Sequence, residues 1–263
     1  MNEPTDQDKT SLPFTAPCNE LELNAPIQWL KLGWQDIKQA PVPSLSYGVL
    51  IVAFSYLLAY LALTFGNLVV LLSLLSGFIF TGPIIALGFY DISHQLELKQ
   101  TPTLAHAIKT SMRHIGNEML FAMFLLVVFL VWARAFSMSH VFFPAFAEPS
   151  FAQQATFLAV AFAVGTLFAL FIFCISAFSL PMIMDRKADM ITAAVTSFNA
   201  VLRNKAVMLF WALLIVAVVG FGMATAFIGL AIAMPLVGHA TWHAYQETID
   251  SAAWPKHQEH VQS

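Results

Sequence analysis

The positions of the cationic residues constrain this chain more than any other feature of its sequence. Eleven of its twelve Lys and Arg residues fall in polar segments that long apolar stretches separate, and the exception is Arg134. If the chain crosses a membrane six times, all of those polar segments lie on one side of it. Because Lys and Arg accumulate on the cytoplasmic side of membrane proteins, the sequence predicts that both termini are cytoplasmic.

The composition excludes a water-soluble fold. Hydrophobic residues make up 59% of the 263 residues and charged residues only 10%, whereas a soluble domain has about 25% charged residues. Lipid must therefore be the solvent for much of the chain, and the lipid bilayer is its predicted partner. The net charge of −3 lacks the bulk basicity that nucleic-acid binding favours, so no nucleic-acid partner is expected.

The apolar stretches predict an all-α, polytopic membrane helical bundle. A spanning helix needs about 20 apolar residues, and four stretches qualify: 45–65, 68–90, 119–137 and 155–184. The last stretch, 206–237, is predicted to form two short spans broken near 220–222; the alternative is one span plus a buried re-entrant segment. The preferred reading gives six transmembrane helices.

Three cytoplasmic connectors have the periodicity of amphipathic helices. Their apolar positions are Ile27, Leu30, Trp34 and Ile37 in the first, Leu104, Ala107, Ile108, Met112 and Ile115 in the second, and Ile191, Ala194, Val195, Phe198, Val201 and Leu202 in the third. Thr101 and Asp189 are predicted N-caps. We expect each helix to lie in the membrane interface with its apolar face toward lipid.

This order of elements predicts a weak threefold repeat in a single membrane domain over residues 25–248. Each unit has an amphipathic helix, a span, and a second span with a proline; the units are about 26–92, 101–187 and 189–247, and the prolines are Pro83, Pro181 and Pro235. The prolines are interpreted as shared packing bends, with a hinge or a lined cavity as the alternative. Residues 1–24 are predicted to be a disordered cytoplasmic tail and 249–263 a cytoplasmic tail.

Several short motifs carry a family resemblance. The stretches WLKLGWQDI, PSLSYG, TGPIIALGFYDIS, SLPMIMDR, VLRN and GHATWHAY resemble a family of bacterial inner-membrane proteins, domain of unknown function 2189, over about residues 26–248. The resemblance implies a six-span bundle and no activity that could be assigned to particular residues. Some relatives bear the label of a cytochrome c oxidase subunit. No histidine here lies at the middle of a predicted span, so a catalytic oxidase role is excluded while an accessory role stays open.

Two histidines are the candidates for binding a metal or haem. His239 and His243 are four residues apart, so both imidazoles lie on one face of a helix. Further ligands on the same side of the membrane could be His94, His106 and His114. The preferred interpretation is that the two histidines, Trp242 and Tyr245 form a belt of rings at the membrane interface, each with one edge in contact with water. The sequence therefore predicts no cofactor and no metal.

Four charged residues lie near the ends of predicted spans. Arg134 is expected to anchor the outer end of the third span beside Trp132. Asp91, Asp185 and Arg186 are expected to stop the second and fourth spans at the cytoplasmic interface and to pair with neighbouring charges. An ion path is the alternative for these residues.

The sequence predicts a non-enzymatic scaffold, accessory or assembly protein that holds a membrane-protein partner or forms a homo-oligomer. It contains no phosphate loop, nucleophile elbow or zinc-protease motif. No Asp, Glu or Lys lies at the centre of a predicted span, and proton-coupled carriers generally need such a group. Two alternatives stay open: a transporter or channel for a small neutral or amphipathic solute, and a metal- or haem-binding redox subunit.

Overall fold

The computed structural model describes residues 13–65, 85–103, 115–142 and 150–256. Regular structure in these ranges is helical apart from two isolated β-bridges. The helices are α2 (Ala25–Gln39), α3 (Pro41–Phe65), α6 (Ile115–Phe142), α7 (Phe151–Ser176), α8 (Ser179–Asp185), α9 (Met190–Arg203), α10 (Lys205–Ala224) and α11 (Leu230–Thr248). Residues 85–97 are also helical. The all-α class predicted from the sequence is therefore confirmed.

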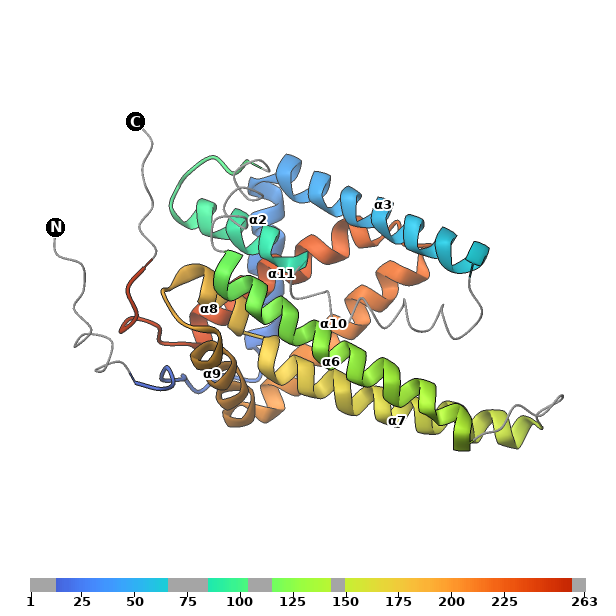
Figure 1. Cartoon of the computed structure of the whole chain (residues 1–263). Helices are drawn as coiled ribbons and strands as arrows, with labels where there is room; N and C mark the ends of the chain where they lie inside the picture. The colour runs from blue at the N-terminus through green and yellow to red at the C-terminus, as the bar shows by residue number, and fades with distance from the viewer. Residues whose placement is uncertain (1–12, 66–84, 104–114, 143–149, 257–263) are drawn as a thin grey trace.

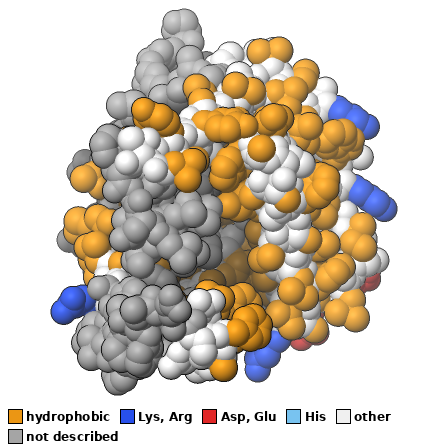
Figure 2. Space-filling view, turned by 90° about the vertical axis from the view of Figure 1, so that its right-hand side faces the viewer, with side chains coloured by type: hydrophobic (Ala, Val, Ile, Leu, Met, Phe, Trp, Pro, Cys, Tyr) orange, Lys and Arg blue, Asp and Glu red, His pale blue; other side chains and the backbone are white. Residues whose placement is uncertain are grey.

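Long apolar helices dominate the described chain. Three helical stretches within it are long and apolar enough to cross a membrane: Pro41–Leu61, Phe151–Asp185 and Lys205–Ala224. A shorter apolar helix covers Met119–Ala135. Large side chains on these helices, such as Phe162 (78% exposed), face outward. Figure 2 shows hydrophobic side chains over much of the described face, with charged side chains at its margin. Such a surface needs lipid around it.

One end of the bundle, which we call the base, collects the elements that do not run along it. In Figure 1, α3, α6, α7 and α10 extend away from the base, while α2 crosses it at a steep angle to them and α8 and α9 lie beside it. α11 packs against both α2 and α3, and α7 against α9. The core of the base is rich in aromatic rings, with Trp29 and Trp211 in an edge-to-face contact at 5.5 Å between centroids.

The chain segments next to both termini are part of the base. The main-chain N–H of Ala16 donates to Thr196 Oγ1 (3.0 Å), and that of Asn19 donates to the carbonyl of Thr248 (2.9 Å). Cys18 forms an isolated bridge with Ile249. Residues 13–24 thus pack on α9 and on the end of α11 rather than forming part of the predicted tail, because side chains and main chain of the base bond their backbone. Residues 1–12 lie outside the described residues.

The apolar stretch 206–237 divides into two helices that lie side by side, α10 and α11. The break falls at 225–229, a few residues after the predicted 220–222. Ala226 and Phe227 have positive φ angles of 52° and 67°, which turn the chain. The side chain of Thr225 accepts a hydrogen bond from the N–H of Gly229 (2.8 Å) and fixes that turn. Gly220 stays inside α10, where nothing interrupts the helix.

α9 buries its small and hydroxyl side chains and exposes its large apolar ones. Asp189 Oδ1 accepts from the N–H groups of Ile191 and Thr192, both at 3.0 Å, so the predicted N-cap is confirmed. The buried face consists of Thr192, Ala193, Thr196, Ser197, Ala200 and Val201. Ile191 (61%) and Phe198 (39%) are exposed. The second predicted amphipathic helix falls largely on residues 104–114, outside the described residues.

Candidate functional site: a buried polar cluster in the base

The base contains a polar cluster built from four helical segments. Asp36 comes from α2, Ser44 from α3, Ser93 from the segment 85–97, and His239 and His243 from α11. We call these five residues the His239 cluster. All are buried except His243, whose side chain is 22% exposed. The four-residue spacing puts both histidines on one face of α11, and that face lies against α2.

His239 is held by a hydroxyl on each side of its ring. Nε2 lies 3.0 Å from Ser44 Oγ, and Nδ1 lies 2.7 Å from Ser93 Oγ. Ser93 Oγ donates to Asp36 Oδ2 (2.6 Å). Because that hydroxyl has a single proton, it must accept from Nδ1–H, and Nε2 in turn accepts from Ser44. The network thus assigns the neutral Nδ1–H tautomer.

Asp36 joins the two histidines. His243 Nε2 lies 2.9 Å from Asp36 Oδ2, the same oxygen that accepts from Ser93. Burial lowers the pKa of His239 from 6.5 to about 4, although the charge of Asp36 raises it in part. A histidine in the unfolded chain takes up a proton near pH 6.5, so this residue's contribution to stability is intact above that pH. It is lost as the pH falls toward 4.

Ser44, His239 and Ser93 follow one another as a hydroxyl, an imidazole and a group that orients the imidazole. In hydrolases this order of groups activates a nucleophile. Here Ser44 and His239 are both 0% exposed, so a substrate has no access to either. No group of three His, Cys, Asp or Glu side chains placed to hold a metal occurs in the described ranges. Both ring nitrogens of His239 are already bonded to serines. The arrangement is suited to joining helices.

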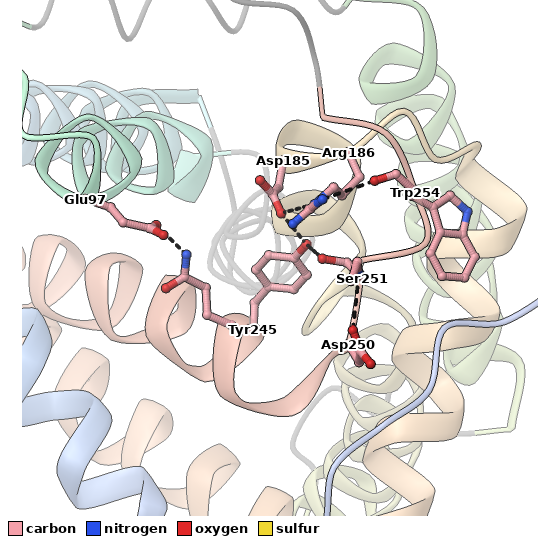
Figure 3. A network of polar contacts seen from close by, with 9 residues as sticks. Glu97, Asp185, Arg186, Tyr245, Asp250, Ser251 and Trp254 are labelled. Carbon is pink, nitrogen blue, oxygen red and sulfur yellow. Dashed lines mark hydrogen bonds and ion pairs between the residues drawn. The ribbon is translucent and has the colours of Figure 1, made fainter. Parts of the chain in front are cut away.

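A second polar network joins α8, α11 and the chain beyond α11 (Figure 3). The Tyr245 hydroxyl donates to Asp185 Oδ2 (2.8 Å) and lies 3.0 Å from Ser251 Oγ. Arg186 pairs with Asp185 (2.8 Å) and donates to the carbonyl of Trp254 (3.1 Å). Burial and the charge of Asp185 both raise the pKa of Tyr245, so its hydroxyl stays protonated. The expected pairing of Asp185 with a neighbouring charge is confirmed.

Asp91 is buried one helical turn before Gln95, whose side-chain amide donates to Asp91 Oδ2 (2.5 Å). Asp185 is the last residue of α8, as the sequence predicts for a residue that stops a span. The helix that contains Asp91 instead continues to residue 97. Asp91 therefore lies inside a helix of the base rather than at its end.

The structure places the other predicted residues as follows. Pro181 and Pro235 are buried, in α8 and α11, and Pro235 lies one turn before His239. Arg134 is exposed on α6, two residues from Trp132, which stacks on Phe129 at 5.8 Å. The rings of His94 and Trp242 are 5.3 Å apart. Pro83, His106 and His114 lie outside the described residues.

The predicted interfacial belt is wrong for three of its four rings. His239, Trp242 and Tyr245 are 0%, 0% and 1% exposed, so none has a wet edge. The reason is that other parts of the base contact them: Ser44 and Ser93 bond His239, and Asp185 and Ser251 bond Tyr245. The indole N–H of Trp242 is the one buried side-chain donor or acceptor without a partner in the part of the chain that the structure describes.

Sequence reasoning missed Asp36, Ser44 and Ser93. Asp36 had one available signal: it is the only acidic residue in α2, and it lies on the side of the helix opposite Lys31 and Lys38. A lone carboxylate on the packing face of a helix needs a partner. The two serines had no such signal, because a serine near a span is equally able to bond its own helix.

Comparison with known proteins gives a family match over part of the chain. Residues 70–185 match a family described as Predicted integral membrane protein (DUF2189). This match is narrower than the range 26–248 over which the motifs resemble the same family, and it includes Ser93 and Asp185 but not Asp36 or His239. No curated protein and no solved structure matches the chain. Over residues 70–185, the chain is therefore similar to the DUF2189 family of integral membrane proteins.

Proposed function

We propose that the protein is a non-enzymatic scaffold of the bacterial inner membrane that crosses the bilayer six times. The observation that carries this proposal is the use of its buried polar groups. Asp36, Ser93, His239 and Tyr245 bond to other groups of the same chain and tie α2, α8 and α11 into one base. Groups committed to internal bonds fix a rigid platform, which is what a scaffold needs.

The arrangement of the helices supports six crossings. In Figure 1, α3 leads away from the base, α6 leads away again, and α7 returns. α10 then leaves the base and α11 comes back to it. Residues 85–97 are at the base as well. The described ends of the chain meet there too, since Asp250 N donates to the carbonyl of Pro17 (2.9 Å). Both termini on one side mean an even number of crossings.

The repeat is supported at two of its three positions. α2 precedes the long apolar α3, and α9 precedes the long apolar α10. Both short helices leave large apolar side chains exposed, among them Trp34 and Phe198. In a bilayer these side chains would face lipid at the interface. The cations of these segments, including Lys38 and Arg203, are at the base, which the positive-inside rule assigns to the cytoplasm.

The hydroxyls of the long helices favour a scaffold over a transporter. Ser55 donates to the carbonyl of Ile51 (2.8 Å), and Ser176 donates to that of Ile172 (2.7 Å). Thr225 likewise donates to the carbonyl of Gly222 (2.8 Å). Hydroxyls bonded to their own helix do not offer donors to a solute in a cavity.

Reporter fusions test the proposed topology. Fusions after Gly66, Gln100, Glu148, Lys187, Ala226 and Ser263 should report outside, inside, outside, inside, outside and inside. The fifth site is in the observed turn between α10 and α11. The control for the last fusion is a Ser263→Cys variant treated, in intact cells, with a thiol reagent that does not cross the inner membrane. Labelling of this cysteine from the periplasm would overturn the six-pass arrangement.

Reconstitution tests the scaffold against the transporter. Purified protein in vesicles should leave the efflux of glycerol, a small neutral solute, equal to that of protein-free vesicles, because the described hydroxyls are occupied. The matched variant is Pro235→Ala, which changes the proline inside α11. The transporter would be favoured instead if the wild-type protein raised glycerol efflux above the protein-free rate and the Pro235→Ala variant changed that efflux.

A further inference from the structure

α2 presents an outward strip in which apolar and cationic residues alternate. Ile27, Lys31, Trp34 and Lys38 follow one another at three- and four-residue steps, which places them within an arc of about 60° on a helix with 3.6 residues per turn. All four are exposed, Ile27 to 45% and Trp34 to 42%. The opposite side of α2 is buried against α11, so the strip faces away from the bundle.

The strip carries no acidic residue. Asp36, the one carboxylate of α2, is on the buried side, where it bonds Ser93 and His243. Lys38 Nζ lies 5.7 Å from the centroid of the Trp34 ring, close enough for a cation–π contact. Among the described residues, no ion pair involves either lysine, so the strip carries two positive charges beside an indole.

The two edges of the strip differ in polarity. Gln28, Gln35 and Gln39 are exposed along one edge, while Leu30 and the buried Ile37 lie along the other. Only Ala40 separates α2 from α3, the first candidate span, and α2 crosses the base at a steep angle to it (Figure 1). A helix held in this way can have its glutamine edge toward water and its strip at headgroup depth, while Leu30 and Ile37 pack on the bundle.

We propose that this strip binds the headgroups of anionic phospholipids in the leaflet around the base. Lys31 and Lys38 supply positive charge for the lipid phosphate, and Ile27 and Trp34 contact the upper acyl chain, the depth at which an indole ring is stable in a bilayer. The inference deepens the proposed scaffold by naming a lipid partner. It rests on the base lying at the surface of a membrane.

Native mass spectrometry of the full chain in detergent tests the proposal. Protein titrated with phosphatidylglycerol should bind it more tightly than phosphatidylcholine of the same acyl chains. Each lysine near an anionic surface contributes about a fivefold gain, so Lys31→Gln with Lys38→Gln should lower the phosphatidylglycerol affinity about 25-fold. Phosphatidylcholine binding should stay as it is.

A matched pair of substitutions controls for net charge. Lys187→Gln with Lys256→Gln removes the same charge from exposed lysines of the base outside the strip, and it should leave phosphatidylglycerol binding unchanged. Equal losses in both double variants, or no preference in the wild-type protein, would overturn the proposal. The topology fusions are independent of this result: if they fail while the lysine-dependent preference persists, the six-pass scaffold is wrong and the lipid site stands.

Discussion

Replacing Asp36 by alanine should lower the free energy of unfolding by about 3 kcal/mol, because it removes the acceptor shared by two polar side chains in a largely buried cluster. The substitution leaves Ser93 without its acceptor and His243 without its partner, and both touch the same carboxylate oxygen now. Folded proteins are stable by only about 5–15 kcal/mol. Thermal unfolding of the purified protein in detergent, followed by circular dichroism, should therefore show a large drop in the midpoint.

Two variants make this measurement specific to the cluster. Asp36→Asn keeps one acceptor oxygen in the same place, so its loss should be smaller than that of the alanine variant. Glu22→Ala removes an exposed carboxylate from the segment before α2 and should leave the midpoint near the wild-type value. If Asp36→Ala unfolds at the same temperature as Glu22→Ala, the cluster does not stabilise the base.

Gly33→Ala should also destabilise the protein strongly, although it adds a single methyl group. A Cβ at this position would lie 2.7 Å from the main-chain nitrogen of Ala240 and 2.9 Å from the carbonyl oxygen of Leu236. Both are backbone atoms of α11, so no side chain can move aside and the two helices must separate. Overpacking of this kind costs about 1–3 kcal/mol, and separation would also strain the Trp29 to Glu247 hydrogen bond of 2.6 Å.

Two other glycines allow the same Gly→Ala change at positions where the added Cβ would contact no other atom. Gly165 in α7 and Gly220 in α10 have nothing within 4 Å of the position a Cβ would take. Gly165→Ala and Gly220→Ala should therefore keep or raise the unfolding midpoint, since alanine favours a helix over glycine by up to about 1 kcal/mol. Equal midpoints for Gly33→Ala and Gly165→Ala would mean that α2 is not in backbone contact with α11.

The sequence predicted the long helices well because their signal is local. The stretches 45–65, 119–137 and 155–184 all coincide with helices, since an apolar run of that length has few other structures open to it. The turn between α10 and α11 was misplaced because the pattern pointed to the glycines at 220–222. The chain in fact turns through Ala226 and Phe227, two residues that rarely adopt a positive φ.

The packing faces were harder to predict than the helices. Of the four apolar positions predicted on α2, Ile27 and Trp34 are exposed, Leu30 is half-buried and Ile37 is buried. The buried side of α2 also contains Trp29, Gly33 and Asp36. On α9 the packing face likewise contains Ala193 and small hydroxyl residues. Where lipid replaces water, apolar side chains can stay outside and small residues let helices approach. Hydropathy alone therefore does not identify the packing face of either helix.

The candidate site was found in part. His239 and His243 were singled out by their spacing, but their function as a junction depends on Asp36 and Ser93, which are 203 residues or more and 146 residues away along the chain. Such pairing over long separations has no local signature in one sequence. Asp185 and Arg186 were predicted to pair and do so, because they are adjacent; Tyr245, their third partner, could not be assigned to them in advance.

The contact of α2 with α11 also sets the order in which the protein can mature. α2 precedes α11 in the chain, so a ribosome releases it earlier, and chains fold from the N-terminus as they emerge. Until His243 has been synthesised, the carboxylate of Asp36 lacks its histidine partner. A chain that stops before α11 therefore keeps an unpacked α2 that proteases can reach.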